Sequence, residues 1–245
     1  LKYQSISRRG EKEVRICNFN SDNFGFVNDM SRIDRSNAHL HEVRFKSMTK
    51  TISEEFCDIV ILFSIVAQTV EKTEEVINYI IDSIEEENRI WDYSIAETNN
   101  RSIRNIVLFD SKKVELLETI DHKDLPLSSF DDSKDNFFSQ SPIEVTFKVA
   151  GQGKSPVRAV RVIAASFMNG PLRDYNQSLL YRLQIADALY KMSKVAKEEL
   201  TEYGRPIVVL AIDRFDGPYT ETQKIIEGKL SFQEFGNADN CNIEK

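Results

Sequence analysis

Three short apolar runs, rich in β-branched and aliphatic residues, divide this chain. Residues 57–63 (CDIVILF), 106–110 (IVLFD) and 207–213 (IVVLAID) are apolar throughout except for one aspartate in each. Continuous apolar runs of this length are typical of strands that are buried on both faces of a sheet. We therefore expect these segments to form central strands, with each aspartate at or near a strand end.

Between these runs, apolar residues recur at the three- and four-residue spacing of a helix. Residues 42–56, 69–89 and 176–203 are predicted to be helical, and Gly204 is a natural end for the last helix. Further strands are expected at residues 11–20, 103–110 and 143–149. Strands that alternate with helices predict an α/β fold with mixed, partly parallel sheets flanked by helices.

The segment that follows residue 154 is open to two interpretations. Ser155 is a natural N-cap, Pro156 a natural first helical residue and Gly170 a natural end, which together predict a helix. The β-branched stretch at residues 157–163 favours a strand instead. The sequence alone leaves both interpretations open.

A polar, acidic and serine-rich stretch with two prolines occupies residues 117–142. Such a composition is typical of a linker or a long surface loop. We expect it to separate an N-terminal α/β lobe at residues 1–116 from a C-terminal α/β lobe at residues 143–245.

Composition and charge narrow the class of protein. The hydrophobic fraction is 41% and the charged fraction 29%, as in an ordinary globular protein. A formal net charge of -7 argues against tight nonspecific binding to nucleic acid, although it permits a local basic cleft. Three widely spaced cysteines without a CxxC pair favour a reducing compartment, so we expect a cytoplasmic protein. No run reaches the roughly 18 apolar residues of a membrane span.

The first candidate site combines Asp58 with the segment Asp110-Ser111-Lys112. Side chains alternate along a strand, so Asp110 and Lys112 share a face, and Asp58 on a neighbouring strand can converge on them. Two carboxylates can bind Mg²⁺ through oxygen ligands, and a nearby lysine can stabilise the charge that builds on a phosphate. This pattern points to phosphoryl chemistry.

The same pattern resembles the restriction-endonuclease-like superfamily, with its PD-(D/E)XK motif, over residues 42–113. The resemblance implies a hydrolase: a magnesium-dependent nuclease that cleaves phosphodiesters of DNA or RNA. It implies Asp58 and Asp110 as metal ligands, Lys112 as the group that orients the nucleophile, and Glu42 as a further acid. The proline that the family carries before the first aspartate is absent from this sequence.

The second candidate site is the glycine-containing turn at residues 148–155 (KVAGQGKS). It resembles a P-loop, in which backbone N–H groups and a helix N-terminus cradle phosphates, although lysine replaces the first glycine. The resemblance implies nucleotide or phosphate binding. The residues concerned would be Gly151, Gly153, Lys154, Ser155 and, at a strand end, Asp213.

Three functions remain open at this level. The leading hypothesis is the magnesium-dependent nuclease, with nucleic acid as its partner. The second is a nucleotide- or phosphate-binding domain. The third is a non-catalytic interaction subunit of a larger assembly. The acidic composition and the imperfect motifs favour this hypothesis. A protein partner or a homo-oligomer is compatible with all three.

Overall fold

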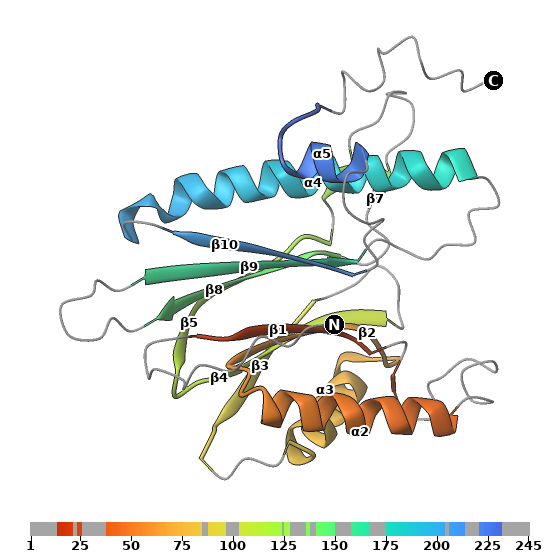
Figure 1. Cartoon of the computed structure of the whole chain (residues 1–245), viewed down its shortest axis with the longest axis vertical. Coiled ribbons are helices and arrows are strands. Elements are labelled where there is room, and N and C mark those ends of the chain that lie inside the picture. The colour runs from red at the N-terminus through yellow and green to blue at the C-terminus, as the bar shows by residue number, and fades with distance from the viewer. Residues whose placement is uncertain are drawn as a thin grey trace, which may run out of the picture.

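The chain folds into two four-stranded sheets that pack face to face, with helices on both outer sides (Figure 1). This arrangement confirms the predicted α/β class with mixed sheets flanked by helices. The computed structural model describes residues 14–21, 24–25, 38–84, 88–96, 103–123, 125–127, 136–137, 141–149, 158–166, 175–203, 206–213 and 221–231.

The first sheet contains, in spatial order, β1 (Ile16–Asn20), β2 (Ile59–Val66), β4 (Ile103–Asp110) and β3 (Trp91–Ile95). β1 pairs with β2 in parallel, and the other two pairings are antiparallel. Its outer face is covered by α2 (Ala38–Glu54) and α3 (Val70–Asp82). The strand β3 was not expected from the sequence.

The second sheet contains β10 (Ile207–Asp213), β9 (Arg158–Ser166), β8 (Ile143–Val149) and β5 (Val114–Asp121). β10 pairs with β9 in parallel, and the other pairings are antiparallel. Its outer face is covered by α4 (Tyr175–Glu199), the 3₁₀ helix Leu200–Tyr203 and α5 (Glu221–Ile226). A short pair, β6 (Pro126–Leu127) and β7 (Asn136–Phe137), lies outside the two large sheets.

One apolar core fills the space between the sheets. Ile61 and Phe109 from the first sheet and Phe147 and Val162 from the second are fully or almost fully buried in it. The rings of Phe109 and Phe147 meet edge to face at 5.0 Å. The two sheets share this core, and β5 of the second sheet (Val114–Asp121) spans the start of the segment 117–142 that we expected to be a linker.

α3 shows why its sequence forms a helix at this position. The hydroxyl of Thr69, the N-cap, accepts a hydrogen bond from the backbone N–H of Lys72 at 3.2 Å. Val76, Ile77 and Ile80 then recur at helical spacing and are fully buried. The helix ends at Asp82, earlier than the residue 89 expected from the sequence.

The helix expected from Ser155 to Gly170 is wrong, and the alternative interpretation of this segment is correct. Residues 158–166 form β9, which lies between β8 and β10. The β-branched residues of this segment suit a strand that is buried on both faces, and this packing outweighs the Ser-Pro helix start.

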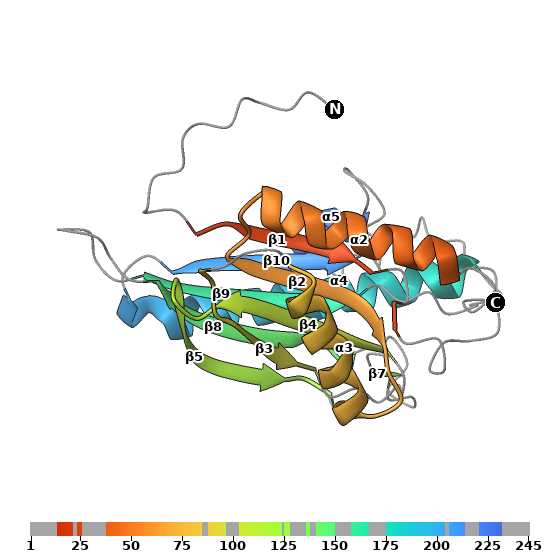
Figure 2. The same ribbon diagram turned by 90° about the horizontal axis from the view of Figure 1, so that it is seen from below.

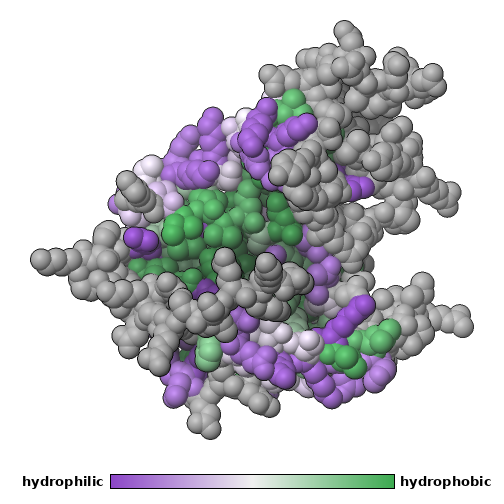
Figure 3. Space-filling model, viewed as in Figure 1, coloured by the Kyte–Doolittle hydropathy of each residue, from purple (hydrophilic) through white to green (hydrophobic). Residues whose placement is uncertain are grey.

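β1 and β10 each form one edge of their sheet, and both lie on the face turned to the viewer in Figure 1, as the orthogonal view shows (Figure 2). An apolar area occupies the centre of this face (Figure 3). β10 contributes Ile207, which is 41% exposed, and the half-buried Val208, Val209 and Leu210. No described helix is long and apolar enough to cross a bilayer.

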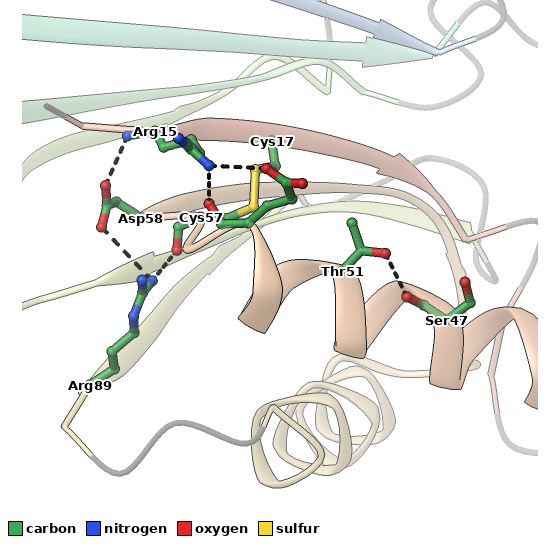
Figure 4. Close-up of a disulfide and its surroundings, with 8 residues drawn as sticks. Arg15, Cys17, Ser47, Thr51, Cys57, Asp58 and Arg89 are labelled. Atoms are coloured by element: carbon green, nitrogen blue, oxygen red, sulfur yellow. Dashed lines mark hydrogen bonds and ion pairs between the residues drawn. A yellow bond between two sulfur atoms is a disulfide. The ribbon is translucent and has the colours of Figure 1, made fainter. Parts of the chain in front are cut away.

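Cys17 on β1 and Cys57, just before β2, form a disulfide with a Cα–Cα distance of 5.8 Å (Figure 4). The cysteine spacing favoured a reducing compartment, in which disulfides are rare. In the parallel register of β1 and β2, Cys17 pairs with Val60, and Cys57 comes close to Cys17 from the turn that precedes β2. Pairing of this kind is not visible in cysteine spacing.

Candidate functional site

The antiparallel pairing of β2 with β4 brings together the two aspartates that the sequence singled out. Ile59 pairs with Phe109, so Asp58 and Asp110 lie opposite each other, and the N–H of Asp110 donates to the carbonyl of Asp58 at 2.9 Å. Both side chains are almost fully buried. The pairing therefore places Asp58 and Asp110 on adjacent chain segments at the same end of the first sheet.

An arginine stands beside both carboxylates. Arg89 Nη1 lies 3.8 Å from Asp58 Oδ1, and Arg89 Nε lies 4.0 Å from Asp110 Oδ2, with the arginine side chain only 8% exposed. Its guanidinium also donates to the carbonyl of Cys57 (Figure 4). The same guanidinium lies 5.4 Å above the ring of Trp91. The guanidinium supplies positive charge at the place where the nuclease hypothesis expects a metal.

Backbone groups satisfy the same two carboxylates further. The N–H of Arg15 donates to Asp58 Oδ2 at 2.8 Å, and the N–H of Lys112 donates to Asp110 Oδ1 at 3.0 Å. Buried charges are tolerated where they are paired and hydrogen-bonded in this way. We call Asp58, Asp110 and Arg89 the carboxylate–arginine cluster.

The other two residues of the nuclease hypothesis lie apart from these carboxylates. The Lys112 ammonium is exposed and donates to the carbonyl of Asn88 at 2.7 Å. Glu42 is exposed near the start of α2 and pairs with Lys46 at 2.8 Å, which lowers the pKa of Glu42 through the hydrogen bond and the charge of that lysine. About 18 Å of helix separates Glu42 from Glu54 at the other end of α2, near Asp58.

The P-loop-like turn falls largely outside the described residues, which resume at Arg158 after Val149. The turn connects β8 to β9, two antiparallel neighbours. A P-loop joins a strand to a helix whose N-terminus faces phosphate, and the segment that follows this turn is a strand. Gly151, Gly153, Lys154 and Ser155 are themselves not described.

The fifth residue of that hypothesis, Asp213, meets a residue that sequence reasoning missed. Asp213 ends β10 and is 6% exposed, and Asn20 ends β1. Asn20 Nδ2 donates to Asp213 Oδ1 at 2.9 Å, which joins the two sheets across 193 residues of sequence. The carboxyl ends of two strands, each with a parallel neighbour, therefore meet at one end of the molecule.

Further polar side chains collect where these strands end. Ser166, the register partner of Asp213, donates through its hydroxyl to Asn105 Oδ1 at 3.0 Å. Asn105 Nδ2 in turn donates to the carbonyl of Ser141 at 3.4 Å. Ser166, Asn105 and Ser141 are each at most 2% exposed. We call Asn20, Asp213, Ser166 and Asn105 the strand-end cluster.

A bulge in β2 lies beside this cluster. Phe63 is the register partner of Asn20, and the pairing of β2 with β4 shifts between Leu62 and Ile65. Ser64 within the bulge has a φ of 63°, in the left-handed region that few residues other than glycine adopt. Bulges that re-aim side chains are common next to functional sites. A sequence signal was available, because β1, β9 and β10 each end on a polar residue: Asn20, Ser166 and Asp213.

The donor set of the strand-end cluster can be compared with the needs of a metal. No group of three His, Cys, Asp or Glu side chains is placed to hold a metal within the part of the chain that the structure describes. Magnesium needs fewer protein ligands than this, because it keeps several waters and commonly binds one or two carboxylates together with substrate phosphate. The Asp213 carboxylate and the oxygens of Asn20 and Ser166 fit that mode, whereas a thiolate- or imidazole-bound metal has no ligand here among the described residues.

Solved structures share this arrangement of two sheets flanked by helices. An endonuclease/exonuclease/phosphatase family protein from Bacteroides thetaiotaomicron matches with a TM-score of 0.52 and 12% identity, over 88% of this chain and 68% of that one. A mannosyl-6-phosphatase from the same organism matches with a TM-score of 0.54 and 10% identity, over 88% and 70% of the two chains. This chain has the endonuclease/exonuclease/phosphatase fold. The nuclease resemblance stated from the sequence named a different fold and is corrected here.

ANGEL2, a 2′,3′-cyclic phosphatase, matches with a TM-score of 0.51 and 17% identity over 88% of this chain. The match spans 56% of ANGEL2, so this chain corresponds to a little over half of that protein. No protein-family model matches the chain. No curated protein matches it by sequence either. At these identities the likeness establishes the endonuclease/exonuclease/phosphatase fold.

Proposed function

We propose that the chain hydrolyses phosphoesters with the help of a divalent metal, and that the strand-end cluster is the site. One observation carries the proposal: Asn20 and Asp213 bond across the two sheets at the carboxyl ends of β1 and β10. In α/β sheets, ligands bind outside the carboxyl ends of strands. The names of the similar structures, which include phosphatases, support phosphoester chemistry on this fold.

Within this proposal, each residue has a limited role. The Asp213 carboxylate would hold Mg²⁺ together with the substrate phosphate, and the amide of Asn20 orients that carboxylate through the 2.9 Å hydrogen bond. The ion, when bound, polarises the phosphoryl oxygens and lowers the pKa of its water. Ser166 and Asn105, already bonded to each other, keep the floor of the cluster in place.

Nucleic acid is the substrate class that we propose. The net charge of -7 limits the attraction of a long polyanion, because tight backbone binding needs many Lys and Arg contacts. We therefore expect a short oligonucleotide or a phosphodiester end to be the substrate. Long duplex DNA should bind weakly and with little dependence on sequence.

The carboxylate–arginine cluster has a structural role in this proposal. Arg89 is held by the two carboxylates, by the Cys57 carbonyl and by the Trp91 ring. A metal that took both carboxylates would have to displace a guanidinium that is buried with them. We propose that the Arg89 guanidinium remains beside Asp58 and Asp110 and that no metal binds between them.

A second candidate function is supported by the composition of the strand-end cluster. Asp213 is its one carboxylate, and the other members are two amides and a hydroxyl. With a single carboxylate and no histidine, lysine or second acid, such a set offers few groups that can activate water, and it can hold a phosphate through a metal ion without hydrolysing it. Under this alternative the chain is a non-catalytic phosphoester-binding subunit.

Hydrolysis assays with matched variants separate these functions. Purified protein is incubated with bis(p-nitrophenyl) phosphate and with a short single-stranded RNA, in Mg²⁺ or Mn²⁺. Asp213→Asn should lower the rate by a factor on the order of 100 or more, the size typical of losing an acid–base or metal-binding group. Asp82→Asn, an exposed aspartate at the end of α3, should leave the rate unchanged.

The other outcomes point elsewhere. Loss of hydrolysis in a folded Lys112→Ala variant, with Asp213→Asn fully active, would return the site to Asp58 and Asp110. Absence of hydrolysis in the folded wild-type protein, together with thermal stabilisation by the RNA, would favour the non-catalytic alternative.

A further inference from the structure

The disulfide joins the strand that carries Asn20 to the turn before the central strand β2. Cys17 lies three residues before Asn20 on β1 and is half-buried, while Cys57 is fully buried. Both side chains pack against the core between the first sheet and its two helices. The bond therefore connects a reachable edge strand to an interior position (Figure 4).

β1 depends on few other contacts. It is an edge strand, and β2 is the strand that it pairs with in the described part of the sheet. At its start, the backbone of Arg15 bonds to Asp58 and Ile59, and the Arg15 guanidinium pairs with Glu55 at 3.0 Å. A strand that is held on one side only is the kind of element that opens before the rest of a domain.

The far end of β1 carries the contacts of the candidate site. Asn20 bonds to Asp213, and both the N–H and the hydroxyl of Ser21 donate to the carbonyl of Phe63, at 3.0 Å and 2.6 Å. Any loosening of β1 against β2 moves Asn20 relative to Asp213. The disulfide is the single covalent tie on this strand.

From this placement we propose that the Cys17–Cys57 disulfide is a redox-responsive clamp on β1. In the oxidised protein the clamp keeps β1 against β2 and Asn20 against Asp213. In the reduced protein β1 opens locally while the rest of the fold persists. The effect on hydrolysis rests on the proposed function, whereas the effect on β1 does not.

The reductant is a dithiol, and the chemistry is thiol–disulfide exchange. A thiolate of the dithiol attacks Cys17 Sγ, the more accessible sulfur, and the bond to Cys57 breaks with its electron pair left on Cys57 Sγ. The second thiolate of the dithiol then attacks its own sulfur partner in the mixed disulfide and releases Cys17. The dithiol leaves as a cyclic disulfide, oxidised by two electrons, and both cysteines take protons from water.

Hydrogen exchange read by mass spectrometry tests the clamp on the full chain. The protein is compared before and after reduction by dithiothreitol, with alkylation used to count the newly released thiols. Exchange of residues 14–21 should rise on the order of tenfold or more in the reduced protein, while exchange of β8 in the centre of the second sheet stays unchanged. Hydrolysis should fall in parallel and return after reoxidation.

Cysteine variants complete the test. Cys17→Ser should show the exchange pattern of the reduced protein without any reductant, and Cys241→Ser, which leaves the disulfide intact, should behave as wild type. Unchanged exchange at residues 14–21 after complete reduction would overturn the clamp. Equal loosening of both sheets would also overturn it, because the bond would then support the whole fold. If β1 opens and no hydrolysis is ever seen, the clamp stands and the proposed function fails.

Discussion

The two ends of the first sheet carry polar residues that look alike in the sequence and differ in their partners. At the start of β2, Asp58 and Asp110 face the buried guanidinium of Arg89. At the other end of the sheet, Asn20 bonds to Asp213 of the second sheet. The first end holds one guanidinium beside two carboxylates within one sheet, and the second end joins two sheets through a neutral amide and a carboxylate.

This difference shows that a carboxylate beside an apolar strand is not by itself a sign of catalysis. The partner of the carboxylate decides its role. A buried arginine lies between two carboxylates and stabilises the ends of β2 and β4, whereas the amide of Asn20 binds the Asp213 carboxylate through a hydrogen bond that carries no formal charge of its own. The contrast assigns stability to one end of the sheet and proposed chemistry to the other.

Removal of Arg89 should have the largest effect on the free energy of unfolding. A small effect would contradict the contrast between the two ends of the first sheet. Arg89→Ala leaves Asp58 and Asp110 buried without their arginine, and we expect the free energy of unfolding to fall by about 3–5 kcal/mol. Urea denaturation followed by circular dichroism measures the loss. Lys112→Ala, an exposed change in the same region, should cost within about 0.5 kcal/mol. A loss in Arg89→Ala no larger than this control would deny the cluster its structural role.

Loss of the disulfide should have the second-largest effect on stability. Cys17→Ser opens a loop closed by residues 40 positions apart, and we expect a loss of about 2–4 kcal/mol in the free energy of unfolding. The same denaturation experiment, performed without reductant, measures it. A variant as stable as the wild type would indicate that the bond does not form in the folded protein.

Loss of the amide at the strand ends should affect hydrolysis more than stability. Asn20→Ala removes one hydrogen bond to Asp213, and we expect a rate reduced roughly tenfold with about 1 kcal/mol lost in stability. Asn18→Ala is the matched control, since Asn18 is exposed on the same face of β1 two residues earlier. Equal rates in the two variants would remove Asn20 from the site.

The smallest effect concerns Glu42, and it separates a surface ion pair from a metal ligand. The hydrogen bond and charge of Lys46 lower the pKa of Glu42, so the contribution of this pair to stability is present above the unfolded-state pKa of a glutamate. It is lost as the pH falls through the lowered pKa of the folded state. NMR titration should show the pKa of Glu42 rising towards its ordinary value in Lys46→Ala. An unchanged pKa in that variant would mean that another group holds Glu42.

Much of the fold could be predicted because most of its strands and helices follow from local patterns of apolar residues. The apolar runs that became β2, β4 and β10 and the periodic stretches that became α2, α3 and α4 were all identified from the sequence. The strand β5 was missed because three acidic residues within its eight positions, on an edge strand, give it the composition of a loop. The segment of β9 offered a helix start and a β-branched run together, and burial between two neighbouring strands decided for the strand.

The candidate site was less accessible to sequence reasoning because its contacts are long-range. Register makes Asp58 and Asp110 neighbours, and the apolar runs predicted that much, but Arg89 reaches them from a segment that no motif marked. Asn20 and Asp213 belong to different sheets, and strand patterns say nothing about which sheets will face each other. Disulfide pairing depends on the same kind of register information.

The most direct measurement locates the metal without relying on turnover. Paramagnetic Mn²⁺ is titrated into isotope-labelled protein, and NMR line broadening is followed at amides that sit on each cluster. The side-chain amide of Asn20 reports on Asp213, and the backbone N–H groups of Arg15 and Lys112 report on Asp58 and Asp110. We predict that the Asn20 amide broadens first while the other two stay sharp. Broadening of the Arg15 and Lys112 amides before that of Asn20 would contradict the assignment of the site to the strand ends.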